Sequence, residues 1–187
     1  KCYAALDDVP QTSDLVIIVV NAARVADMLE QCGKKGVPYV VIFTSGFSET
    51  GGDGVALQQR LTAIARQYHI GVIGPNCQGM MNVADKTYAG FGSVFFSDFP
   101  AGAVSMVSQS GGFGFSVLSL SSLDGGLAFR QMVTTGNEVG VSTLDFIDYF
   151  IRDPHTDVIV GYIEGVKDAH RITEIGARPM VAGKPIL

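Results

Sequence analysis

The chain has 187 residues, 47% hydrophobic and 17% charged, and its net charge of −5 argues against a nucleic-acid partner, which would need a basic face. The apolar runs at residues 15–20 and 39–43 are too short to span a bilayer, which takes about 20 residues, and no signal peptide opens the sequence, so we expect a cytoplasmic protein without a membrane partner. Its cysteines form no Cys-x-x-Cys pair, so neither a disulfide scaffold nor a metal site is predicted.

Strand-like and helical patterns alternate along the first half of the chain. Strands are predicted at residues 15–20, 39–44 and 71–73, and helices near 22–31 and 55–68. Alternation of this kind with nearly continuous apolar strands predicts a parallel sheet covered by helices on both faces. In the second helix, one face is predicted to pack on the core because its apolar residues recur at three- and four-residue spacing: Leu57, Leu61, Ile64, Ala65 and Tyr68.

Residues 83–101 lose this rhythm, and we place a domain junction there. The alternation then restarts with predicted strands at 103–107, 129–134, 158–163 and 185–187 and helices near 112–123, 143–152 and 169–178. Ser142-Thr143-Leu144-Asp145 predicts a capping box at the start of the middle helix. The expected fold is therefore α/β, with two parallel-sheet domains at residues 1–100 and 101–187.

The stretch from Val107 to Gly114 takes an apolar strand straight into a small-residue turn that opens a helix. The first amides of a helix have no intrahelical partner, and the macrodipole places roughly +0.5 charge there, so such a turn binds anions. The predicted phosphate-binding residues are Ser108, Gln109, Ser110, Gly111 and Gly112. An ordinary tight βα connection has the same pattern, and the turn alone leaves that alternative open.

Three further motifs accompany this turn: Gly74-Pro75-Asn76-Cys77-Gln78-Gly79, Gly136-Asn137 and Gly161-Tyr162-Ile163-Glu164-Gly165. In this order they resemble the α-subunit type of the nucleoside-diphosphate-forming acyl-CoA synthetases, the superfamily of succinyl-CoA synthetase and ADP-forming acetyl-CoA synthetase. The resemblance covers nearly the whole chain. It is closest to the acetyl-CoA type, through Ser45-Gly46-Phe47-Ser48-Glu49 and Glu164-Gly165-Val166-Lys167-Asp168. It implies a Rossmann-like CoA-binding domain followed by a flavodoxin-like ligase domain.

The resemblance also implies a reaction. Such acid–thiol ligases interconvert acyl-CoA, nucleoside diphosphate and phosphate with acid, CoA and nucleoside triphosphate, through an acyl phosphate and a phosphohistidine. The implied partners are CoA, the acyl substrate, and an ATP-grasp domain or subunit that holds the nucleotide (ADP/ATP or GDP/GTP) with Mg²⁺; a homo-oligomer is a further expectation. The first βαβ unit of such a domain, with its glycine-rich turn, is absent, and by this alignment the phosphorylated histidine lies beyond Leu187. We therefore expect both ends of the fold to continue and these 187 residues alone to be inactive.

Residues at the predicted strand ends receive roles from the same resemblance. Glu164 corresponds to the glutamate that orients the histidine, although an exposed glutamate at a strand end is an ordinary alternative. Pro75 and Asn76 are also common turn residues. The residues implied to contact CoA are Val20, Asn21, Ala22, Thr44, Ser45, Gly46, Phe47, Asn76 and Cys77; relatives usually carry proline in place of Asn21, which leaves that contact open.

Two other functions were weighed. A non-catalytic CoA-binding or regulatory module of a protein acyltransferase would contain the same two domains and differ in the sequence that flanks them. A nicotinamide dehydrogenase needs a Gly-x-Gly-x-x-Gly turn with an acidic residue about 20 positions further on, and this chain has no such turn. The histidines His69, His155 and His170 lie outside the family's histidine loop, and we expect them at the surface.

Overall fold

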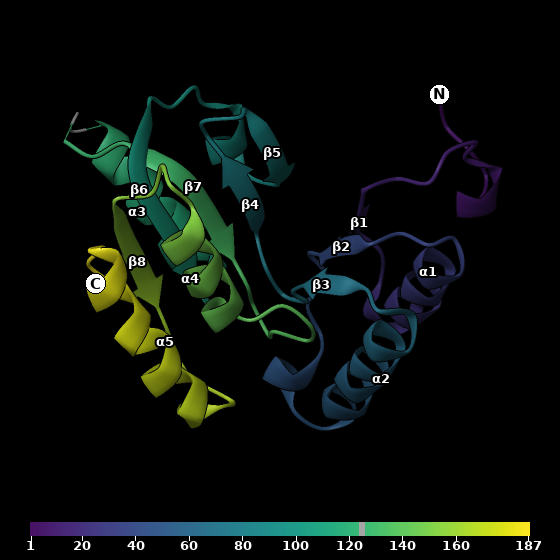
Figure 1. Ribbon diagram of the computed structural model, residues 1–187. Helices are drawn as coiled ribbons and strands as arrows, with labels where there is room; N and C mark the ends of the chain where they lie inside the picture. The colour runs from purple at the N-terminus through teal and green to yellow at the C-terminus, as the bar shows by residue number, and fades with distance from the viewer. Residues whose placement is uncertain (124–125) are drawn as a thin grey trace. The chain divides into compact units, whose positions relative to one another are not determined.

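The computed structural model describes residues 1–123 and 126–187 (Figure 1). These residues divide into a first unit, residues 1–77 with 137–141, and a second unit, residues 78–136 with 142–187. The junction expected near residue 100 falls inside the second unit in this division, because strands from both sides of it pair in one sheet.

The first unit contains a parallel sheet of β1 (Leu15–Ile18), β2 (Tyr39–Ile42) and β3 (Gly71–Ile73), in that spatial order. Two helices connect these strands, α1 (Ala22–Lys34) and α2 (Asp53–Tyr68), and the short 3₁₀ turns η1 (Leu6–Asp8) and η2 (Ser48–Thr50) complete the unit. The predicted strands and helices of this half are confirmed.

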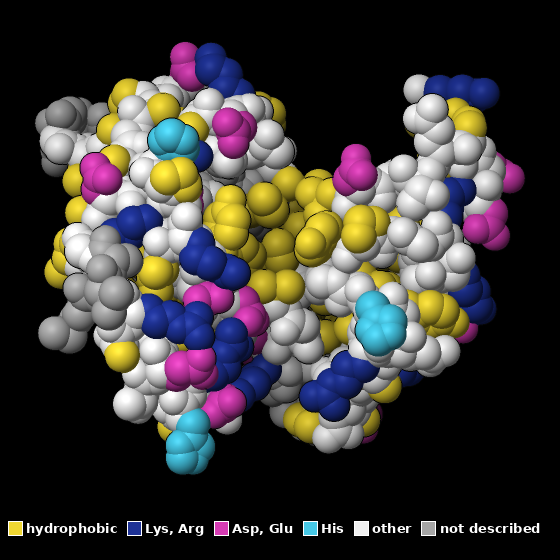
Figure 2. Space-filling model, viewed as in Figure 1, with side chains coloured by type: hydrophobic (Ala, Val, Ile, Leu, Met, Phe, Trp, Pro, Cys, Tyr) yellow, Lys and Arg dark blue, Asp and Glu magenta, His cyan; other side chains and the backbone are white. Residues whose placement is uncertain are grey.

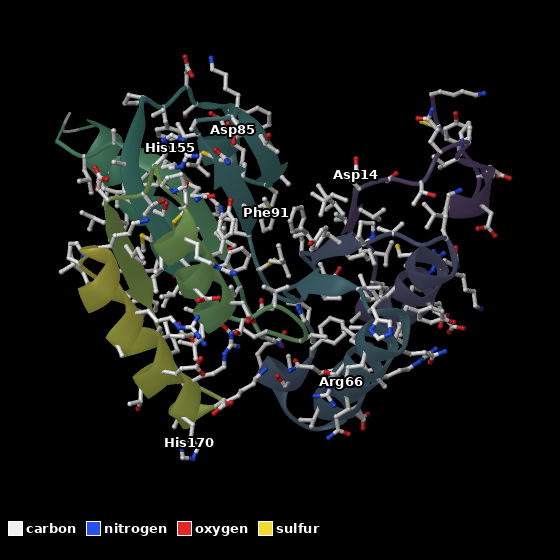
Figure 3. The ribbon with its side chains drawn as sticks, in the orientation of Figure 1. Asp14, Arg66, Asp85, Phe91, His155 and His170 are labelled. Atoms are coloured by element: carbon white, nitrogen blue, oxygen red, sulfur yellow. The ribbon has the colours of Figure 1, made fainter. Side chains whose placement is uncertain are left out.

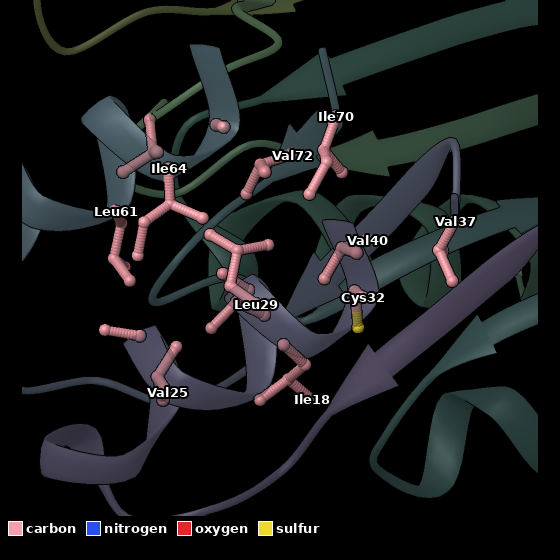
Figure 4. Packing of buried hydrophobic residues seen from close by; sticks show 14 of the residues in the cluster. Ile18, Val25, Leu29, Cys32, Val37, Val40, Leu61, Ile64, Ile70 and Val72 are labelled. Carbon is pink, nitrogen blue, oxygen red and sulfur yellow. The ribbon is translucent and has the colours of Figure 1, made fainter. Parts of the chain in front are cut away.

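Both helices of the first unit pack on the same face of its sheet (Figure 4). Val25 and Leu29 from α1 and Leu61 from α2 are fully buried against Val40 from β2. Successive right-handed crossovers in one direction place their helices on one side, so the expectation of helices on both faces is not met in the described part of this unit. The predicted apolar face of α2 is confirmed, since all of its residues are buried in this cluster or pack against it.

The second unit contains a mixed sheet with the order β5-β4-β7-β6-β8. Its strands β6 (Ala101–Ser108), β7 (Phe129–Thr134) and β8 (Val158–Tyr162) are parallel, as predicted. In contrast, β4 (Gly79–Asn82) pairs antiparallel with β7 and with β5 (Thr87–Gly90), which lies where the sequence predicts only a junction. The 3₁₀ turn η3 (Ser93–Phe96) follows β5, and Pro185–Leu187 pairs parallel with β8 as expected.

Helices α3 (Gly111–Leu123), α4 (Thr143–Arg152) and α5 (Ala169–Ala182) flank this sheet. The crossover from β6 to β7 and the one from β7 back across to β8 run in opposite directions, so α3 and α4 lie on opposite faces, and α5 packs beside α4 (Figure 1). The neighbouring strands β6 and β8 therefore send their following helices to different sides. Their carboxyl ends form a topological switch point, the position at which open α/β sheets bind ligands.

Candidate functional site

The predicted phosphate turn joins β6 to the start of α3. The Ser108 hydroxyl donates to the Ser110 carbonyl (2.6 Å), and the Ser110 hydroxyl accepts from the Phe113 amide (3.5 Å). These hydroxyls therefore shape the turn and cap the helix. The amides of Gly111 and Gly112 occupy positions that a helix leaves without an intrahelical acceptor, and such amides can donate to an anion.

Gly112 and Gly114, both in α3, differ in how much space surrounds them. A Cβ on Gly114 would lie 2.2 Å from Cε of Met132 on β7 and 2.9 Å from Cβ of Ser108 on β6, so a larger residue would push the helix away from these strands. A Cβ on Gly112 would meet nothing within 4 Å. The close approach at Gly114 fixes the helix start, while Gly112 leaves the space in front of the turn open.

The side chain of Gln109 joins this turn to the one that follows β8. Its Oε1 accepts from the amides of Glu164 (2.6 Å) and Gly165 (2.9 Å), and its Nε2 donates to the Gly165 carbonyl (2.7 Å). The Gln109 amide also donates to the Tyr162 carbonyl (3.0 Å). The structure thus brings the predicted phosphate turn and Glu164 together at the switch point, and the Glu164 side chain lies exposed beside it.

A residue without a predicted role, Thr135, supports the same turn from β7. Its amide donates to the Ser108 carbonyl (2.9 Å), and its hydroxyl shares a hydrogen bond with that of Thr143 (3.0 Å). Thr135 is fully buried. In the sequence, its position just before the Gly136-Asn137 motif is the feature that could have indicated this role.

In the first unit, the predicted CoA-contacting residues gather at the carboxyl edge of the sheet. The Thr44 hydroxyl donates to the Val20 carbonyl (2.7 Å), and the backbone N–H of Asn76 donates to the Thr44 carbonyl (3.0 Å). Asn21 caps α1, because its Oδ1 accepts from the Ala23 amide (3.0 Å). Its φ of −54° lies in the range that a proline ring imposes, so the local backbone suits either residue.

Two of the residues predicted to contact CoA have buried side chains. Phe47 is 1% exposed and Cys77 is 3% exposed, and the Cys77 sulfur lies 3.4 Å from the Ile42 carbonyl. A ligand at this edge would therefore meet the backbone of these two residues. Ser45, Gly46 and Asn76 are more accessible.

Glu49 holds the loop that carries Ser45 and Gly46. Its Oε1 accepts from the amides of Gly46 (2.6 Å) and Phe47 (3.1 Å), and its Oε2 accepts from Nδ2 of Asn137. Burial raises the pKa of Glu49, but these hydrogen bonds outweigh burial and leave its pKa below the usual value. The carboxylate is therefore charged at neutral pH.

The histidines occupy three separate surface positions. His69 ends α2 in the left-handed conformation, His155 precedes β8, and His170 lies in the first turn of α5. All three are exposed, and Figure 3 labels His155 and His170 at opposite ends of the second unit. Because His155 lies at the amino end of β8, it belongs to the sheet edge opposite Glu164.

Charges over α4 and α5 are interspersed (Figure 2). Arg171 pairs with Asp145 (2.6 Å), and Arg178 contacts Asp148 and Glu174. Among residues 1–123 and 126–187, no group of three or more His, Cys, Asp or Glu is arranged to hold a metal ion. In the same residues, no helix combines the length and apolar character that crossing a bilayer requires.

Two protein families match this chain. Residues 1–83 match the family described as CoA binding domain, and residues 101–187 match the succinyl-CoA ligase like flavodoxin domain. An acetate–CoA ligase [ADP-forming] of Methanocaldococcus jannaschii is 40% identical over 187 residues, which are 100% of this chain and 25% of that protein. The acetate–CoA ligase [ADP-forming] I subunit alpha of Pyrococcus furiosus is 35% identical over 187 residues, 100% of this chain and 39% of the subunit.

A solved structure extends the match to three dimensions. The Ca. Korarchaeum cryptofilum dinucleotide forming acetyl-coenzyme A synthetase 1, in complex with phosphate and ADP, superposes with a TM-score of 0.90 at 32% identity, over 100% of this chain and 39% of that one. The chain therefore spans between a quarter and two fifths of these relatives. By these matches the chain carries a CoA binding domain at residues 1–83 and a succinyl-CoA ligase like flavodoxin domain at residues 101–187.

Proposed function

We propose that the protein is an acid–thiol ligase that makes or uses an acyl-CoA with a nucleoside diphosphate and phosphate, and that this chain supplies its CoA-binding and phosphoryl-binding parts. The two matched families and the names of the relatives support this proposal. They favour it over a regulatory module of a protein acyltransferase, because the reported relatives are named as ligases or synthetases. ADP is the nucleotide that their names support.

The observation that carries the proposal is the bridge formed by Gln109 at the switch point. One side of this bridge is a helix start whose amides suit a phosphoryl group, and the other side presents a carboxylate, Glu164. A phosphorylated imidazole needs both, because its phosphoryl oxygens need donors and its second ring nitrogen needs an acceptor. In the second unit this helix start and Glu164 follow adjacent strands, which supports the proposal.

The proposed chemistry proceeds in three transfers. Phosphate attacks the thioester carbonyl, the carbon–sulfur bond breaks, and CoA leaves as its thiol with an acyl phosphate remaining. A histidine nitrogen then attacks the phosphorus, the acid leaves, and the phosphoryl group passes finally to the nucleoside diphosphate. The amides of Gly111 and Gly112 would hold the phosphoryl oxygens, and Glu164 would accept from the N–H of the imidazole.

Further partners follow from this chemistry. The family resemblance implies a phosphorylated histidine other than His69, His155 and His170, so the proposal assigns the imidazole to chain outside these 187 residues. It assigns the nucleotide and Mg²⁺ to an ATP-grasp domain or subunit. The ADP in the complex of the Korarchaeum relative supports the nucleotide, and the subunit alpha name of the Pyrococcus relative supports a second subunit.

A titration of the chain with inorganic phosphate, followed by amide chemical shifts, tests the phosphate turn. The expected result is saturable shifts at Gly111 and Gly112, because these amides are free donors at a helix start. The start of α4 is the internal control, because Ser142 accepts from the Asp145 amide there and the Asp145 carboxylate repels an anion. Shifts confined to other positions, or equal at both helix starts, would contradict the proposal.

A further inference from the structure

Residues 137–141 leave the second unit after β7, join the first unit, and return to begin α4. Along this segment the Asn137 amide donates to the Pro75 carbonyl (2.9 Å), the Val139 amide to the Gly74 carbonyl (3.0 Å), and the Val141 amide to the Val72 carbonyl (2.8 Å). The segment therefore runs beside β3 and the turn that follows it. This places the Asn137 side chain at the carboxyl edge of the first sheet.

The Asn137 side chain is a hydrogen-bond hub. Its Nδ2 donates to Oε2 of Glu49 and to Oε1 of Gln58 (2.9 Å), and its Oδ1 accepts from Nδ2 of Asn76 (3.4 Å). Because Glu49 is an acceptor only, it determines which end of the Asn137 amide faces it. The Asn137 oxygen then faces Asn76, which determines the orientation of the Asn76 amide in turn.

Glu49 connects the Asn137 side chain to the loop at residues 44–50. One carboxylate oxygen holds the amides of Gly46 and Phe47, and the other is held by Asn137. Hydrogen bonds to a charged carboxylate are roughly twice as strong as neutral ones, so loss of the Asn137 donor would remove a strong constraint on Glu49 and loosen the loop. Residues 44–47 of this loop and Asn76 are among the residues that the family resemblance implies for CoA.

We propose that Asn137 is a positioning residue for CoA binding. It fixes the loop at residues 44–50 through Glu49, and it fixes the side-chain amide of Asn76 directly. This inference rests on the proposed function. The same stretch of chain also reaches the phosphate turn, because Thr135, two residues earlier, donates to the Ser108 carbonyl.

Exchanged donors and acceptors test this positioning role. Asn137→Asp removes the donor and sets two carboxylates against each other, whereas Asn137→Asp with Glu49→Gln restores a donor–acceptor pair with the roles reversed. Asn137→Ala removes the donor without adding charge. The matched control is Asn82→Asp, which places the same change beside a carboxylate in the second unit, where Asn82 donates to Asp85 (2.8 Å).

The readouts are CoA titration of the chain and hydrogen exchange at the Gly46 and Phe47 amides. We expect the two single Asn137 variants to bind CoA about tenfold more weakly and to exchange faster at both amides, and the double variant to recover most of both losses. The control should stay within about twofold of the wild type.

The outcomes separate the two proposals. Unchanged exchange in the single variants, or a double variant no better than Asn137→Asp, overturns the positioning role. Wild-type CoA binding that the single variants retain in full also overturns it and leaves the proposed function standing. A wild-type chain without any CoA binding counts against the proposed function, while the exchange data still decide whether Asn137 holds the loop.

Discussion

Gln109 shows how far the identity of one side chain determines the geometry of the site. Two amides donate to its oxygen, and its nitrogen donates to a carbonyl of the same turn, so the residue must be an acceptor and a donor at once. A glutamate would lack the donor and would place a second negative charge near the phosphate turn. Glutamine is therefore the residue that fits both the geometry and the charge.

Gln109→Ala is expected to free the turn that carries Glu164. The amides of Glu164 and Gly165 lose their acceptor, so their hydrogen exchange should accelerate about tenfold or more, and the phosphate shifts at Gly111 and Gly112 should need a higher phosphate concentration. Residue-resolved hydrogen exchange measures the first effect. Gln59→Ala, at an exposed position on α2, is the control, and equal exchange in both variants would count against the bridge.

At the scale of elements, the carboxyl end of α4 is held by a buried polar network. Asp153 accepts from Nε of Arg130 (2.6 Å), from Nε2 of Gln131 (3.1 Å) and from the Thr156 hydroxyl (2.8 Å). Lys184 donates to the carbonyls of Ile151 (2.8 Å) and Asp153 (2.5 Å), which the helix itself leaves without partners. The network connects α4 to β7 and to the chain that enters the strand beside β8.

This network makes stability depend on pH in a defined direction. Burial raises the pKa of Asp153, but the hydrogen bonds and the Arg130 charge outweigh burial, so its pKa in the folded protein lies below the unfolded value of about 3.9. A lowered pKa contributes stability that is complete above the unfolded value and is lost as the pH falls through the folded value. Asp153 therefore stabilises the second unit at neutral pH.

Asp153→Asn should lower the free energy of unfolding by about 2–3 kcal/mol at neutral pH, because it leaves Arg130 without its carboxylate. The difference from the wild type should shrink as the pH falls below about 4. Urea unfolding at several pH values measures both effects. Asp157→Asn, at an exposed neighbouring position, should change stability by less than about 0.5 kcal/mol, and a pH-independent deficit in Asp153→Asn would rule out this account.

At the scale of the whole molecule, local patterns predict most elements and few of the long-range pairings. Apolar runs and helix periodicity predict β1 to β3 and the three helices of the second unit, because burial and local propensity agree there. The hairpin β4–β5 has no such signal, because its short strands contain glycine and alternate weakly. Its register comes from pairing with β7, which lies far along the chain.

The candidate site likewise has parts that local sequence patterns predict and parts that depend on long-range pairing. The phosphate turn and Glu164 follow predicted strands, so their places at the sheet edge could be anticipated. The roles of Gln109, Thr135 and Asn137 depend on which strands become neighbours, and on the passage of residues 137–141 into the first unit. Sequence spacing carries no record of either. Phe47 and Cys77 matched the family pattern, yet their burial assigns any ligand contact to their backbone.

Phosphoryl transfer in the full-length protein tests the central claim most directly. The protein is incubated with γ-labelled nucleoside triphosphate, and label that is acid-labile and alkali-stable is mapped to a residue. We expect label on a histidine outside these 187 residues. In Glu164→Gln the amount of label should fall at least about tenfold, because an amide holds an imidazolium less well than a carboxylate does. Label on His69, His155 or His170, or label unaffected by Glu164→Gln, would contradict the account.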